Sequence, residues 1–177
     1  TQRSTLFPYT TLFRSSGGAD HAVRIWDVAT GDLHQIIGLP IEHGKLRPVH
    51  SVCFSADGNQ VAACDGTERL GFWQWTPTEW IGGRRLAGHT GPVHDVAFSP
   101  DGGLAASAGW DHTIRLWDTA NCEERGALKG HTHAVRSVVF TPSGTRLISG
   151  SEDTSVRSWP VRGGRSHVVC KARRQIF

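Results

Sequence analysis

The sequence contains no methionine and only one tyrosine in 177 residues, and its apolar residues occur in short runs. Because a membrane-spanning helix needs roughly 20 apolar residues in succession, we expect no membrane segment. The N-terminus also lacks a charged region followed by an apolar run, so no signal peptide is visible. These absences favour an internal fragment of a longer protein.

Motifs for metal binding and catalysis are missing as well. The sequence has four cysteines: Cys53, Cys64, Cys122 and Cys170. They show no Cys-x-x-Cys spacing, so we expect neither a structural zinc site nor a disulfide framework. No nucleophile elbow, phosphate-binding loop or zinc-binding helix motif occurs. The sequence therefore predicts no metal, no cofactor and no local active site. Unpaired thiols favour the cytoplasm as the compartment.

What the sequence does contain is a repeat. Four tryptophans, separated by 47, 44 and 42 residues, mark it: Trp26, Trp73, Trp117 and Trp159. The segment Ser99–Gly102 returns in the same register as Thr141–Gly144. Self-similarity at such a period is typical of stacked β-sheet repeats.

The landmarks of the third and fourth repeats resemble the WD-repeat β-propeller family. They are Gly88-His89, Ser107, Asp111 and Trp117-Asp118, followed by Gly130-His131, Ser149, Asp153 and Trp159. The resemblance implies an all-β fold, a partial propeller of four-stranded antiparallel blades. We place the incomplete propeller at residues 16–170, with repeats near 16–39, 44–86, 88–128 and 130–170, and a basic tail at 171–177.

The third repeat gives the clearest strand pattern. His94, Val96 and Phe98 alternate as a first strand, and a turn of Ser, Pro, Asp and Gly follows. We expect the next three strands at 104–108, 113–118 and 124–128. The fourth repeat follows the same plan, with 167–170 as the only candidate for its last strand.

In this family, the matching residues form a hydrogen-bonded network that locks each blade. The resemblance therefore implies one network of His89, Ser107, Asp111 and Trp117, and a second network of His131, Ser149, Asp153 and Trp159. These residue types also offer the components of a hydrolase triad, but the resemblance assigns them a structural role. For His131, this use is favoured over metal ligation together with His133.

The first two repeats depart from the pattern. In repeat two, Gly44-Lys45 stands in place of Gly-His and Thr67 replaces the turn aspartate, so we expect that blade to form through burial and sheet pairing. Trp75 and Trp80 have no counterpart in the repeat; we interpret them as packing residues, with a contact site as the alternative. Repeat one lacks its first strand, so about three and a half blades should not close a ring, and the open fragment has edges for self-association.

Residues 1–15 are interpreted as non-native, because residues 6–15 resemble a translated sequencing adapter. The alternative is a genuine strand, since Leu, Phe, Tyr and Thr favour strands. Without Arg3 and Arg14, Lys+Arg falls from 19 to 17 against 16 acidic residues, and the net charge falls from +3 to +1. We do not expect nucleic-acid binding, because the remaining excess lies in the C-terminal tail and specific binders concentrate their charge on an ordered face.

The resemblance implies a non-catalytic scaffold that binds a protein or peptide on one propeller face. The alternative is a regulatory or substrate-binding module of a larger enzyme whose catalytic domain lies outside these residues. The family's offsets place seven residues on the binding face: Pro48, His50, Pro92, His94, Trp110, Arg136 and Glu152. Trp110 and Arg136 are the strongest candidates, because Trp and Arg are frequent interface hot spots. The other possibility is that Trp110 only shields its turn and Arg136 is solvated.

Overall fold

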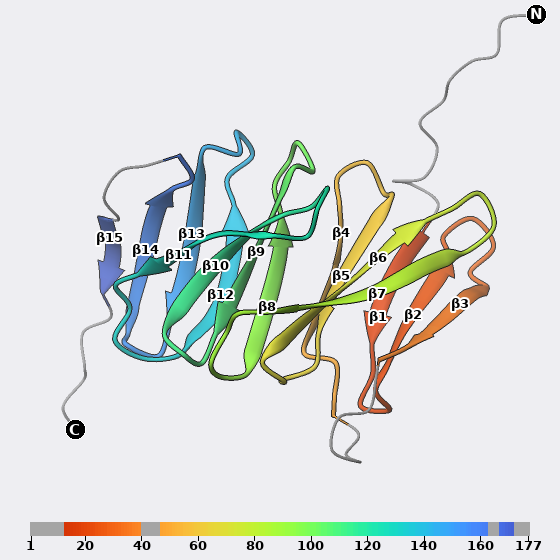
Figure 1. Cartoon of the computed structure of the whole chain (residues 1–177), viewed down its shortest axis with the longest axis horizontal. Coiled ribbons are helices and arrows are strands. Elements are labelled where there is room, and N and C mark those ends of the chain that lie inside the picture. Colours follow the sequence, from red (N-terminus) through yellow and green to blue (C-terminus); the bar gives the residue numbers. More distant parts are fainter. Residues whose placement is uncertain (1–12, 40–46, 163–166, 172–177) are drawn as a thin grey trace, which may run out of the picture.

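The computed structural model describes residues 13–39, 47–162 and 167–171, and all regular elements within them are β-strands. Fifteen strands form one three-stranded and three four-stranded antiparallel sheets. The sheets stand side by side in chain order, as Figure 1 shows from the sheet of β1, β2 and β3 at one end to the sheet that ends with β15 at the other. The prediction of an all-β, partial propeller with antiparallel blades is confirmed. The described part contains no helix long and apolar enough to cross a membrane.

Each sheet corresponds to one blade. Blade 1 contains β1 (Phe13–Gly17), β2 (Ala22–Asp27) and β3 (Leu33–Gly38). Blade 2 contains β4 (Ser51–Phe54), β5 (Gln60–Cys64), β6 (Arg69–Trp75) and β7 (Trp80–Ala87). Blade 3 contains β8 (Val93–Phe98), β9 (Leu104–Gly109), β10 (Thr113–Asp118) and β11 (Glu124–Lys129). Blade 4 contains β12 (Val135–Phe140), β13 (Arg146–Ser151), β14 (Ser155–Pro160) and β15 (His167–Lys171).

Turn chemistry explains how the first two strands of a blade are joined. In blade 3, the Ser99 hydroxyl donates to Asp101 at 2.5 Å and accepts the Leu104 amide hydrogen at 2.9 Å. Gly102 takes a φ of 71°, a conformation that side chains disfavour. Ser55, Asp57 and Gly58 repeat the arrangement in blade 2. The Ser-x-Asp-Gly segments therefore act as hairpin turns, as predicted.

The hydrophobic core lies between blades rather than within them. Each of three clusters joins two neighbouring blades, and each contains the tryptophan of the later blade packed against the earlier one: Trp73, Trp117 and Trp159. Alanines on β9, such as Ala105 and Ala106, allow the sheets to approach closely. Among the first strands, β8 contacts both β4 and β12 at the inner edge of the array.

Both chain ends show how the structure relates to the predicted boundaries. β15 pairs with β14, which confirms the candidate last strand of repeat four. β1 pairs with β2 and begins at Phe13, so three residues of the segment interpreted as non-native take part in blade 1. Blade 1 has no first strand among the described residues, as expected. Gly44-Lys45, residues 1–12 and the tail after Lys171 lie outside the described residues.

Candidate functional site

The predicted network of blade 3 is brought together in the buried part of the blade. His89 Nε2 lies 2.8 Å from Ser107 Oγ, and His89 Nδ1 lies 2.9 Å from Asp111 Oδ2. The Trp117 indole N–H donates to the same Ser107 Oγ at 2.8 Å. These hydrogen bonds connect four segments of blade 3: the loop before β8, the strand β9, the turn after it and the strand β10.

The direction of each hydrogen bond follows from the donors available. An indole N–H can only donate, so the Ser107 hydroxyl hydrogen is left to donate to His89 Nε2. His89 Nδ1 then carries the hydrogen that is donated to the Asp111 carboxylate, which assigns a neutral tautomer. His89, Ser107, Asp111 and the Trp117 indole N–H each have a hydrogen-bond partner in this network, and this makes burial of their polar groups tolerable.

Blade 4 reproduces this arrangement closely. His131 Nδ1 lies 2.8 Å from Asp153 Oδ2, and its Nε2 lies 2.7 Å from Ser149 Oγ. The Trp159 indole N–H donates to Ser149 Oγ at 2.7 Å. Blade 1 keeps only a fragment of it, in which the Trp26 indole N–H donates to Ser16 Oγ at 2.9 Å.

The networks shift the pKa values of their ionisable members. Burial opposes ionisation of Asp111 and Asp153, but hydrogen bonds outweigh it and hold the pKa of both carboxyls well below the usual range; the donors include His89 and Thr113 for Asp111, and Ser155 and His131 for Asp153. Burial also lowers the pKa of His131, and hydrogen bonding to Asp153 only partly opposes this. Both networks therefore contain an ionised aspartate, and in blade 4 burial favours the neutral form of His131.

Ser107, His89 and Asp111 match the connectivity of a hydrolase triad, yet their surroundings prevent that use. Ser107 has no exposed surface, and its Oγ already accepts the Trp117 indole N–H. A nucleophilic hydroxyl must reach its substrate, and this one faces the core. The geometry therefore fits a structural lock.

Blade 2 replaces the network with a different polar cluster. Ala63 and Thr67 occupy the places of the network serine and aspartate, as the strand pairing shows. Asp65, only 1% exposed, accepts hydrogen bonds from the Thr67 amide at 3.1 Å and hydroxyl at 2.6 Å. Arg85 Nη1 lies 3.5 Å from Asp65 Oδ2, and its Nη2 donates to Thr67 Oγ1 at 2.9 Å. The sequence carried a weak signal for this cluster, namely that Asp65 stands two positions before Thr67.

The extra tryptophans of blade 2 pack against their neighbours. Trp80 is buried, with its ring centroid 5.4 Å from that of Trp75 and 5.5 Å from that of Phe54. The Trp75 ring centroid lies 5.3 Å from that of His34 on blade 1. Their arrangement agrees with the packing interpretation.

Five of the seven predicted face residues form a continuous array across three blades. The His50 and His94 rings are stacked, with centroids 5.5 Å apart and planes 5° apart. The His94 centroid lies 5.6 Å from that of Trp110, and the Arg136 guanidinium lies over the Trp110 ring at 5.2 Å. Arg136 also pairs with Glu152, its Nε donating at 2.8 Å. We call this set the stacked face: His50, His94, Trp110, Arg136 and Glu152.

The remaining predicted residues have supporting positions. The Pro92 carbonyl accepts the Trp110 amide hydrogen at 2.8 Å, and the Ala134 carbonyl accepts that of Glu152 at 3.0 Å. These two bonds hold the turn residues of blades 3 and 4 toward the same face. Pro48 is exposed at the start of blade 2.

The charged groups of the stacked face influence the ionisation of His94. Burial lowers the pKa of His94, and the adjacent Arg136 and His50 lower it further, while Glu152 has the opposite effect. Arg136 Nη1 lies 3.1 Å from His94 Nε2, a contact in which a neutral imidazole accepts. The face therefore presents an uncharged imidazole beside a paired guanidinium.

Asp95, which was not among the residues predicted from the sequence, links the blades beneath this face. Its Oδ1 accepts the Ser51 hydroxyl of blade 2 at 2.7 Å. Its Oδ2 accepts the Ser137 hydroxyl of blade 4 at 3.0 Å and the Val138 amide at 2.9 Å. One carboxylate on β8 thus joins three inner strands. Ser51, Asp95 and Ser137 share one repeat position, which was the only sequence signal.

The described residues contain no group of three or more His, Cys, Asp or Glu side chains arranged to hold a metal ion. The family model described as WD domain, G-beta repeat matches residues 39–67, 83–118 and 122–160, which is more than half of the chain. The search of curated proteins found no match to the chain. The two later segments each begin near the last strand of one blade and end with the third strand of the next. One sequence repeat therefore connects two blades.

Proposed function

The chain belongs to the WD-repeat family, and from this membership we propose that it is a non-catalytic platform that binds a protein or peptide partner through the stacked face. WD repeats generally mediate protein–protein interactions, and the family is typically non-catalytic. In this chain we assign partner binding to the stacked face, with Trp110 and Arg136 as the side chains that anchor the partner.

The observation that carries the proposal is the position of Trp110. This indole is 50% exposed, whereas Trp73, Trp80, Trp117 and Trp159 are buried in the core. Arg136 covers part of it and His94 flanks it, so its orientation is held before a partner arrives. A large aromatic surface held in place has little conformational entropy to lose on binding. Such anchors dominate the energetics of protein interfaces.

The polar rim around Trp110 supports a peptide rather than a purely apolar ligand. Arg136 and Glu152 offer donors and acceptors to main-chain groups, and His94 offers one more ring nitrogen. An aromatic centre with a hydrogen-bonding rim is the usual anatomy of a protein interface.

The test is selection of peptides from a displayed library on the purified protein, followed by affinity measurement on variants. For peptides that bind this face, we expect Trp110→Ala and Arg136→Ala to weaken binding by at least about tenfold. Both residues are exposed, so melting temperatures should stay near that of the wild type. Val139→Ala, which alters a 55% exposed side chain outside the stacked face, is the control. Selected peptides that bind both variants as tightly as the wild type would refute the proposal.

A further inference from the structure

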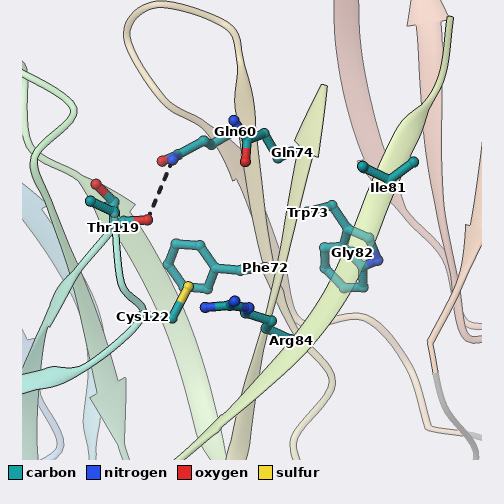
Figure 2. Close-up of a pocket in the computed structure, with 10 residues that line it drawn as sticks. Gln60, Phe72, Trp73, Gln74, Ile81, Gly82, Arg84, Thr119 and Cys122 are labelled. Atoms are coloured by element: carbon teal, nitrogen blue, oxygen red, sulfur yellow. Dashed lines mark hydrogen bonds between the residues drawn. The ribbon is translucent and has the colours of Figure 1, made fainter. Parts of the chain in front are cut away.

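A pocket of about 190 Å³ lies between blades 2 and 3, at the opposite end of the strands from Trp110. Gln60 begins β5 and Thr119 follows β10, whereas Trp110 lies in the turn that follows β9. Figure 2 shows Phe72 on the floor between Gln60 and Arg84, with Cys122 close to the guanidinium. The pocket is independent of the stacked face.

One wall of this pocket holds the side-chain amide of Gln60. Gln60 Nε2 donates to the Thr119 carbonyl at 3.5 Å, which orients the side-chain amide. Gln60 Oε1 is buried and accepts no hydrogen bond from the described residues. Buried acceptors are normally satisfied, so this atom is suited to receive an N–H from a bound group.

On the opposite side lies the Arg84 guanidinium, which pairs with no carboxylate of the described part of the chain. Among the described residues, Arg84 makes only one hydrogen bond, from Nη1 to the Asn121 carbonyl at 3.3 Å. That bond fixes the guanidinium beside the loop that carries Cys122. A guanidinium held in this way retains donors for a carboxylate.

A pocket of about 540 Å³ also lies at the corresponding place between blades 3 and 4, but its lining differs in chemistry. By strand pairing, Leu104, Leu116 and Gly126 of blade 3 correspond to Gln60, Phe72 and Arg84 of blade 2. Leu104 and Leu116 are packed in the apolar cluster between blades 3 and 4. The pair of Gln60 and Arg84 at the two ends of the pocket is therefore specific to blade 2, because Leu104 and Gly126 take these places in blade 3.

We propose that this pocket binds the side chain of a glutamate in a partner peptide. The carboxylate pairs with Arg84, the methylene groups lie on the Phe72 ring, and the glutamate main-chain N–H donates to Gln60 Oε1. Pockets for drug-sized ligands span roughly 300–1,000 Å³, so the smaller volume here suits one residue. Charge and hydrogen-bonding complementarity at the two ends select an acidic side chain over a neutral one.

The thiol of Cys122 reports on occupancy, because it lines the pocket. The probe is N-acetyl-glutamate amide, compared with N-acetyl-glutamine amide, and the readout is the rate of iodoacetamide alkylation measured by mass spectrometry. We expect the glutamate compound at millimolar concentration, the affinity range of a small fragment, to slow alkylation of Cys122. Alkylation of the exposed Cys170 should not change in the same samples.

Two variants test the two ends of the pocket. Arg84→Gln and Gln60→Leu, the latter copying Leu104, should abolish the protection, and Lys129→Gln, which removes an exposed charge on β11, should preserve it. Melting curves of all variants establish that the fold is intact. Equal protection by the glutamine compound, protection that persists in Arg84→Gln, or no protection of the wild type would each overturn the proposal.

Discussion

The guanidinium of Arg136 on blade 4 lies over the indole ring of Trp110 on blade 3, 5.2 Å from its centroid. The stacked rings of His94 and His50 continue this array onto blade 2. The stacked face is therefore formed by packing of the blades and not by a single repeat. Blade packing and partner binding should depend on the same inner strands.

The lock of blade 3 gives the first prediction. Asp111→Ala should lower the free energy of unfolding by about 2–3 kcal/mol, because the substitution leaves buried partners of the carboxylate without an acceptor. Chemical denaturation measures the loss. Asp32→Ala, which removes an exposed carboxylate of blade 1, should have little effect. Equal stability of Asp111→Ala and the wild type would contradict the assigned network.

The replacement cluster of blade 2 gives the second prediction. Asp65→Ala should cost about 3 kcal/mol, because a largely buried Arg85 loses its opposite charge. Combining it with Arg85→Ala should cost less than the sum of the two single losses, with a coupling of roughly 1–3 kcal/mol in a double-mutant cycle. Strict additivity would show that the two side chains do not act together.

Asp95 gives the third prediction, which concerns contacts between blades. Asp95→Ala should destabilise the chain by about 1–3 kcal/mol, since it removes the acceptor for Ser51, Ser137 and the Val138 amide. Amide hydrogen exchange should become faster at Val138, while exchange in β10 and β11, remote from this carboxylate, should change less. Unaltered exchange at Val138 would argue against a link between blades through this residue.

The fourth prediction concerns pH. The pKa of His131 is lowered in the folded chain, so the unfolded chain binds more protons near the ordinary value of about 6.5, and stability should fall as the pH drops from about 7 to about 5. The lowered pKa values of Asp111 and Asp153 predict a second loss as the pH falls below about 4. Denaturation at a series of pH values measures both. Asp153→Asn should reduce the loss of stability below about pH 4. A free energy of unfolding that stays constant from pH 7 to 5 would disagree with a lowered pKa of His131.

Local sequence patterns were sufficient to predict the strands of blade 3. The observed strand β10 has the predicted bounds, and β9 and β11 each extend one residue beyond them. This agreement follows from physics that acts within a few residues, because apolar alternation favours β8 and β10 and Ser-x-Asp-Gly sets the turn between β8 and β9.

Contacts between elements distant in the sequence were harder to predict. Arg85 reaches Asp65 only because β7 pairs with β6 so that Arg85 lies opposite Gly71. Asp95 bridges its neighbours only because three inner strands converge. The family resemblance indicated which residues lie on the binding face, but the stacking of His50 on His94 depends on blade packing, which no single repeat encodes.

The most direct test of the proposed binding face is hydroxyl-radical footprinting of the protein with and without a saturating peptide selected on it. Trp110 is the half-exposed tryptophan of the stacked face, so its oxidation should be readily measurable in the free protein. The account predicts that bound peptide suppresses oxidation of Trp110 and leaves oxidation of the exposed Val139 unchanged. Full oxidation of Trp110 under the bound peptide would contradict it.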